Sequence, residues 1–136
     1  MRSQDEIAQS LIGRQCSNID RTGPVWTFDF DANVRFVSES PWRIIEAERI
    51  LVSDEDDGQA FGLEETKSAL GIARDSLLGQ SVKHVEISKK ADFTIVFDTG
   101  LSLEIWNNSC GYEAWQIHTS DAQLIGLGGG GIQVIT

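Results

Sequence analysis

The chain contains a degenerate internal repeat, in which residues 10–46 recur at 76–119. The tetrapeptide SLIG, which begins at Ser10, returns as SLLG at Ser76, and the run WTFDFDANVRF returns as FTIVFDTGLSL. The second copy has a one-residue insertion early and a longer one in an Asn-rich loop. A duplicated sequence predicts a duplicated structural unit, so we expect a fold made of two related halves.

Each copy is predicted to form a β-meander. The run VWTFDF alternates aromatic with polar residues, which is the period-two pattern of a strand with one buried face. Short turns at 31–33 and 98–100 separate such a strand from the next one in the two copies. Further strands are expected around Trp42 in the first copy and Trp115 in the second.

Two helices are expected beside the strands. Ile7, Ala8 and Leu11 have helical spacing, and Gly13 follows where a short N-terminal helix would end. A central helix is predicted between the copies, at about 63–75. Its apolar stripe consists of Leu63, Ala69, Leu70, Ala73 and Leu77.

The copies are expected to share one interior, because a single meander of this size is too small to bury its own apolar face. The predicted fold is α+β and mainly β, with the two meander units packed as a sandwich or an open barrel. We expect one domain over residues 1–136. Copy one would cover about 10–53 and copy two about 76–136, with the central helix connecting them.

The charge balance limits the classes of partner. The chain has 21 acidic and 11 basic residues, which gives a formal net charge of −10. Nucleic acid and anionic membranes are disfavoured, because both are bound by clustered Lys and Arg. An acidic surface either keeps a small protein soluble or attracts a basic protein partner. The N-terminus lacks the apolar core of a signal peptide, and no window approaches a membrane span, so we expect a cytoplasmic protein.

No metal or cofactor is expected from the motifs. The two cysteines and two histidines do not form the close pairs that zinc sites use. The stretch 53–64 resembles a calcium loop, but it lacks the leading Asp and the flanking helices, so a solvated acidic loop is the better interpretation. The GLGGGG run lacks the Lys and Ser or Thr of a phosphate-binding loop. The residues considered for zinc are Cys16, His84, Cys110 and His118.

Two segments are candidate binding surfaces. One is the loop IWNNSCGYEAW, which combines aromatic, amide and carboxylate groups as recognition surfaces do, although its Asn and Gly residues also suit an ordinary turn. Its candidate residues are Trp106, Asn107, Asn108, Tyr112 and Glu113. The other is an acidic loop formed by Asp54, Glu55, Asp56 and Asp57.

The C-terminal half carries a resemblance. The order FDTGLSLEIW, then YEAW at Tyr112–Trp115, then a glycine pair before a last strand resembles an uncharacterised family of small bacterial β-rich proteins. The resemblance covers mainly residues 80–136. It implies a β-rich fold and a bacterial source but no activity. In size and charge the chain is also similar to immunity proteins, which neutralise a toxin by blocking it.

Two hypotheses about function follow. The first is a non-enzymatic protein-interaction module, immunity-like, that binds a basic protein through its acidic surface and the loop from Asn107 to Glu113. The alternative is a small-molecule-binding protein or hydrolase that uses a cleft between the copies. Homodimerisation through an exposed strand edge is compatible with either. The residues to test for the alternative are Tyr112, Glu113, His118 and Asp121.

Overall fold

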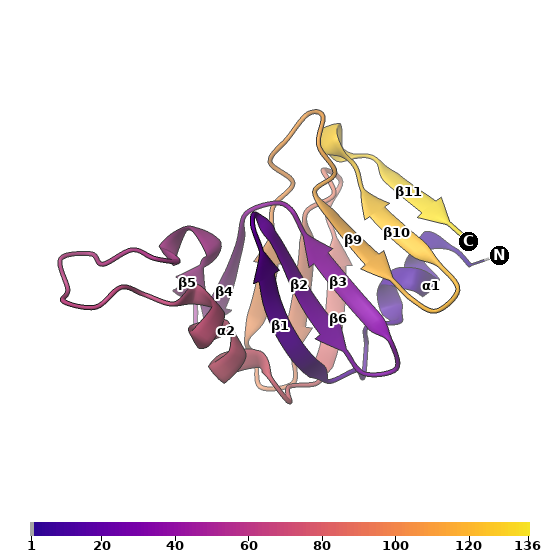
Figure 1. Ribbon diagram of the computed structural model, residues 1–136. Helices are drawn as coiled ribbons and strands as arrows, with labels where there is room; N and C mark the ends of the chain where they lie inside the picture. Colours follow the sequence, from indigo (N-terminus) through magenta and orange to yellow (C-terminus); the bar gives the residue numbers. More distant parts are fainter. Residues whose placement is uncertain (1) are drawn as a thin grey trace.

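A computed structural model describes residues 2–136 as two β-sheets packed face to face (Figure 1). All neighbouring strands are antiparallel. The six-stranded sheet has the order β1 (Cys16–Thr22), β2 (Val25–Phe30), β3 (Val34–Ser38), β9 (Trp115–His118), β10 (Gln123–Gly126) and β11 (Ile132–Ile135). The five-stranded sheet has the order β5 (Arg49–Ser53), β4 (Trp42–Glu46), β8 (Ser102–Ile105), β7 (Phe93–Phe97) and β6 (Val82–Ile87).

The two copies exchange their fourth strands. Trp42 of β4 lies opposite Ile105 of β8, and Trp115 of β9 lies opposite Ser38 of β3. The sequence repeat makes Ser38 equivalent to Ile105 and Trp42 equivalent to Trp115, so these two pairings are the same contact made twice. The predicted duplication is therefore confirmed. The fold is a sandwich rather than a closed barrel, and each sheet contains strands of both copies.

The start of each copy is joined to the other by matching backbone hydrogen bonds. Gly13 N donates to Val82 O, and its equivalent Gly79 N donates to Cys16 O, both at 2.8 Å. Gly13 and Gly79 have φ values of +84° and +82°. This left-handed conformation is accessible to glycine at little cost, which explains why both copies keep a glycine here.

The space between the sheets is filled by aromatic side chains. Trp26 of β2 meets Trp42 of β4 edge to face, with ring centroids 4.9 Å apart. Phe93 of β7 packs in the same way against Trp115 of β9 at 4.8 Å, and Phe36 contacts both of these rings, stacking on Trp115. The buried side chains of both sheets form one hydrophobic cluster. Aromatic pairs of this kind each add about 1 kcal/mol beyond burial.

Two helices pack against the sides of the sandwich, and each contacts strands of both sheets. Helix α1 (Gln4–Gln9) begins with a capping box between Ser3 and Glu6, and it contacts β6, β10 and β11. Helix α2 (Ala69–Leu77) contacts β1, β5 and the short 3₁₀ helix η1 (Asp54–Asp56). The helices occupy equivalent positions, since β6 corresponds to β1 and β10 to β5.

The prediction of a helix over 63–75 is wrong at its start. Residues 61–68 are exposed, with turns and bends over 61–65 and irregular backbone over 66–68, and Leu63 does not join the apolar stripe. The helix begins after Ser68, whose side chain accepts a hydrogen bond from Gly71 N at 3.0 Å. This N-cap fixes the start of the helix, although the apolar pattern extends further back.

The copies differ after their fifth strands. In the second copy the chain passes through the 3₁₀ helix η2 (Gly128–Gly130) and returns along β10 as β11. In the first copy the chain passes through η1 and then leaves the sheet as a projecting hairpin, residues 58–67 (Figure 1). Two hydrogen bonds, Gly58 N to Lys67 O at 2.8 Å and Lys67 N to Gln59 O at 2.7 Å, hold its two arms together.

Candidate functional site

A groove at one corner of the five-stranded sheet brings the two predicted binding segments together. It has a volume of about 330 Å³. Trp106 and Asn108 belong to the second copy, whereas Asp54 and Glu55 directly follow the first. The two segments are far apart in the sequence, so neither one alone indicates the site. We call it the Trp106 groove; its lining is Pro41, Trp42, Arg43, Ile50, Ser53, Asp54, Glu55, Trp106 and Asn108.

Trp106 is placed by strand alternation. Ile105 ends β8 with its side chain in the core, so the next side chain points to the outer face. Trp106 N donates to Pro41 O at 3.0 Å, which keeps this residue beside the start of β4. Trp106 remains 48% exposed. An aromatic side chain that is both positioned and exposed is suited to contacting a partner.

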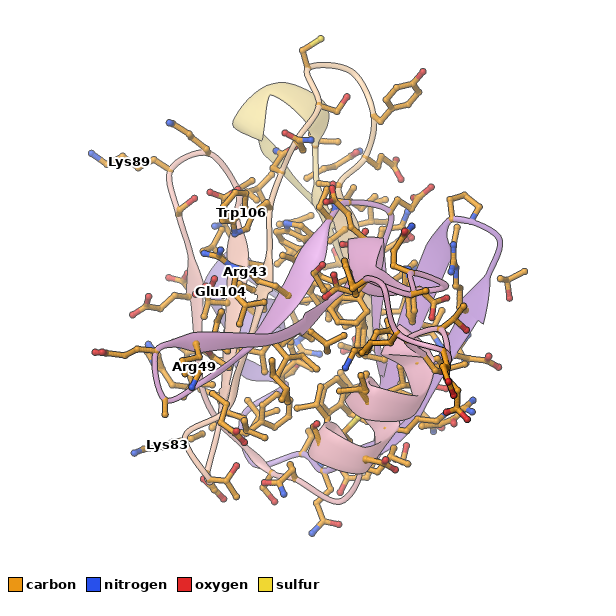
Figure 2. The ribbon with its side chains drawn as sticks, turned by 90° about the vertical axis from the view of Figure 1, so that its left-hand side faces the viewer. Arg43, Arg49, Lys83, Lys89, Glu104 and Trp106 are labelled. Carbon is orange, nitrogen blue, oxygen red and sulfur yellow. The ribbon has the colours of Figure 1, made fainter. Side chains whose placement is uncertain are left out.

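Arg43 fixes the ring of Trp106 from one side. Its guanidinium lies 4.5 Å from the ring centroid, and its Nε donates to Glu104 Oε1 at 2.7 Å. Figure 2 shows the three side chains together on the outer face of the sheet. The cation–π contact and the ion pair hold both flat groups in place, so little side-chain freedom is lost when a partner binds. Arg43 and Ile50 are not among the site residues that the sequence predicts. The alternation of WRIIE indicates that Arg43 points outward, but it does not indicate that Arg43 lies against Trp106.

Asp54 forms the acidic wall of the groove. Burial raises the pKa of its carboxyl, and the neighbouring Glu55 carboxylate raises it further, while the hydrogen bond from Trp42 N, 3.1 Å long, opposes both. A cation placed in the groove would favour the ionised carboxylate. Binding of a cationic group in the groove would therefore lower the pKa of Asp54.

The other acidic residues have different roles. Asp56 accepts a hydrogen bond from Ser53 N at 2.9 Å. Asp57 accepts one from Ala69 N at 2.8 Å and forms an ion pair with Arg21. Glu55 is exposed, and within residues 2–136 its carboxylate has no hydrogen bond or ion pair. Of the four predicted acidic residues, Glu55 is thus the one with a free charge at the groove.

Negative charge is concentrated in the chain segment that contributes Ile50 and residues 53–55 to the groove. Residues 46–65, which we call the acidic segment, contain eight acidic side chains and one basic one, for a formal charge of −7 out of the −10 of the whole chain. The same segment exposes Ile50, Phe61 and Leu63, each with more than half of its surface accessible. This surface therefore combines acidic and apolar groups.

The rest of the predicted binding loop lies outside the groove. Asn107 is structural: its N–H donates to Asp92 Oδ1 at 2.8 Å, and its Nδ2 donates to the carbonyls of Lys90 and Leu127 at 3.0 and 2.7 Å. Tyr112 is 81% exposed at the tip of the loop. Glu113 accepts a hydrogen bond from Gln116 Nε2 at 2.6 Å.

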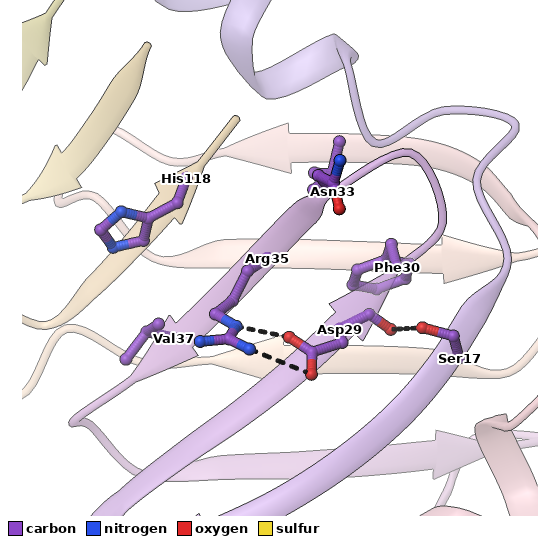
Figure 3. A pocket seen from close by; sticks show the side chains of 8 residues that line it. Ser17, Asp29, Phe30, Asn33, Arg35, Val37 and His118 are labelled. Carbon is purple, nitrogen blue, oxygen red and sulfur yellow. Dashed lines mark hydrogen bonds and ion pairs between the residues drawn. The ribbon is translucent and has the colours of Figure 1, made fainter. Parts of the chain in front are cut away.

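A second hollow, of about 550 Å³, lies on the outer face of the six-stranded sheet, and we call it the His118 hollow (Figure 3). Asp29 and Arg35 form a two-point ion pair in it, which raises the pKa of Arg35. Burial, and then the charge of Arg35, lowers the pKa of His118, so this imidazole is neutral at pH 7.

The geometry of the His118 hollow does not assemble a nucleophile. Ser17 Oγ donates to the backbone carbonyl of Asp29 at 3.2 Å, and Asp29 and Arg35 lie between Ser17 and His118 (Figure 3). His118 Nε2 instead bonds Gln116 Oε1 at 2.8 Å.

The residues proposed for a cleft between the copies are not gathered there. Aromatic side chains fill the space between the sheets, while Tyr112 is at a loop tip and Asp121 pairs with Arg2 at 2.8 Å. Cys16 is buried and Cys110 exposed. No cluster of three or more His, Cys, Asp or Glu side chains within residues 2–136 has a metal-binding arrangement.

Over the same part of the chain, neither helix has the length and apolar character needed to cross a membrane. Comparison of the chain with family models, curated proteins and solved structures gives no match.

Proposed function

We propose that this protein is a non-enzymatic interaction module that binds a basic protein through the Trp106 groove and the acidic segment around it. The observation that carries the proposal is the position of an exposed, oriented tryptophan beside the part of the chain that holds most of its net negative charge. An immunity-like role, in which the surface covers a basic site of a toxin, is one form of this function.

The groove suits a lysine or arginine side chain of the partner. The aliphatic part of such a side chain can lie against Trp106 and Ile50, and its charged end can reach Glu55 and Asp54. The long-range field of the acidic segment would accelerate association with a basic surface. Binding should therefore be weakened by salt and by protonation of Asp54 at low pH.

Affinity capture with matched bait variants tests this proposal. Trp106→Ala and Glu55→Lys alter the groove, whereas Tyr112→Ala removes an exposed aromatic ring outside it. A partner that meets the proposal is retained by the wild type and Tyr112→Ala and depleted by the two groove variants. The captured protein is then purified and titrated calorimetrically at low and high NaCl.

We expect Trp106→Ala to raise Kd by about tenfold or more, as for a central aromatic contact, and Tyr112→Ala to leave it within about twofold. Raised salt should weaken the complex, since the screening length falls to about 8 Å at physiological ionic strength. A partner without a basic surface, or an affinity unchanged by salt, would contradict the proposal.

A second candidate function, small-molecule binding, is favoured by one observation. The His118 hollow contains an ion pair and a neutral imidazole within one concave site. Screening metabolites by thermal shift tests it. A ligand whose stabilising effect disappears in His118→Ala and persists in Trp106→Ala would favour this function; loss in Trp106→Ala instead would assign the ligand to the groove.

A further inference from the structure

The pseudo-two-fold arrangement leaves one strand without a counterpart. In the six-stranded sheet, β11 pairs with β10, opposite residues Gln123 to Gly126. Strand β5 of the five-stranded sheet is equivalent to β10, but no further strand pairs with it, so β5 forms the sheet edge. The position beside β5 that corresponds to β11 is the open seat.

The open seat arises because the chain takes different courses after the two equivalent strands. After η2 the chain returns as β11, whereas after η1 it enters the projecting hairpin and does not run back along β5. Within residues 2–136, β4 is the only strand paired with β5. Ile50 and Leu51 are exposed at this edge.

We propose that the open seat binds an extended segment of a basic protein partner by strand addition, in the way that β11 completes the other sheet. This inference rests on the proposed function and specifies how the partner is held. Backbone hydrogen bonds from the added strand would supply affinity, and its alternate side chains would supply specificity.

The residues at the ends of β5 indicate the chemistry of the added segment. The residues flanking β5 are acidic: exposed Glu46 and Glu48 precede it, and Asp54 and Glu55 follow it. Arg49, the first residue of β5, is the one basic side chain among them. Side chains directly opposite each other on neighbouring strands lie on the same face of a sheet. A residue opposite Ile50 would thus lie on the groove face, where lysine or arginine is favoured, and its neighbours along the added strand would point to the other face.

A second copy of this chain is a poor occupant of the seat. Pairing of two copies through this edge would bring together two acidic segments, each with a formal charge of −7, and these would repel each other. A basic segment avoids this repulsion, because its charge is opposite to that of the acidic segment.

A synthetic probe peptide tests strand addition on the full-length protein. The probe alternates lysine with apolar residues of the kind found in β11 (Lys-Ile-Lys-Val-Lys-Ile). One control peptide has N-methyl groups on alternate amides, which block pairing along one edge, and a second has glutamate in place of lysine. Binding and amide exchange are followed by NMR with the ¹⁵N-labelled protein.

The proposal predicts that the lysine peptide slows amide exchange in β5, and that N-methylation weakens its binding by about tenfold or more. Ile50→Lys in β5 should weaken binding similarly, whereas Val134→Lys, the matched change at the exposed edge of β11, should not. Binding that is insensitive to N-methylation, or that leaves β5 exchange unchanged, would overturn strand addition, as would no detectable binding.

The outcomes also separate this inference from the proposed function. If lysine peptides bind, respond to Trp106→Ala and ignore N-methylation, the groove binds basic side chains but the seat takes no strand. If the glutamate peptide binds as tightly as the lysine peptide, the preference for a basic partner is itself wrong.

Discussion

At the residue scale, the duplication provides natural matched pairs, and the clearest is Trp42 with Trp115. Trp115 Nε1 donates to Ala91 O at 2.7 Å. Within residues 2–136, the buried Trp42 Nε1 has no hydrogen-bond partner. We predict that Trp115→Phe lowers the free energy of unfolding by about 2 kcal/mol more than Trp42→Phe, because it leaves a buried carbonyl unpaired. Urea denaturation of both variants measures the difference, and equal losses would contradict it.

Cys16 provides a second prediction at this scale, on pH dependence. Burial, and secondarily the charge of Asp29, raises the pKa of its thiol from 9.0 to about 12. In the unfolded chain the thiol ionises from about pH 9, so unfolding releases a proton and stability must fall as pH rises from there towards 12. The slope reaches about 1.4 kcal/mol per pH unit.

The control for Cys16 comes from the second copy, where Val82 occupies the equivalent position. Cys16→Val should remove this part of the alkaline slope, as measured by urea denaturation between pH 8 and 11. A slope identical in the variant and the wild type would show that Cys16 does not titrate differently on unfolding. The equivalence of Cys16 and Val82 in the repeat indicates an apolar position, whereas the size of the pKa shift depends on burial that only the structure supplies.

At the element scale, Asp57 anchors the base of the projecting hairpin to α2 and β1 through its bonds to Ala69 N and Arg21. We predict that Asp57→Ala lowers the free energy of unfolding by about 1 kcal/mol, as the loss of a helix-capping acceptor does, and speeds amide exchange at Ala69. Glu64→Ala removes the same charge from the exposed hairpin and should leave both measurements nearly unchanged. Equal effects of the two substitutions would assign the loss to net charge.

The sequence predicted strands better than it predicted the central helix. Alternation in VWTFDF identifies β2 directly, because each aromatic side chain of that run is buried. The predicted helix starts too early because Leu63 fits the apolar spacing, but the Ser68 cap starts α2 at Ala69, six residues after Leu63. Composition also does not indicate that the Asn107 side chain donates hydrogen bonds to two neighbouring loops, at Lys90 O and Leu127 O.

At the scale of the whole molecule, the repeat identified which residues are equivalent but not which residues pair. The exchange of β4 and β9 between the sheets depends on the three-dimensional path of the chain, and a meander confined to its own copy has the same sequence pattern. The Trp106 groove is a consequence of this exchange, because β4 meets β8 only through it. The sequence therefore indicates the acidic loop and the Trp106 loop as separate candidate surfaces, but not that they line one groove.

Two equivalent halves share one core and differ at one sheet edge, because β10 is covered by β11 while β5 is open. Native-state amide exchange, measured by NMR on the free protein, tests this directly. We predict that amides of β5 on the side away from β4 exchange far faster than the equivalent amides of β10. Equal protection of β5 and β10 would mean that the seat is already occupied, and would contradict the account.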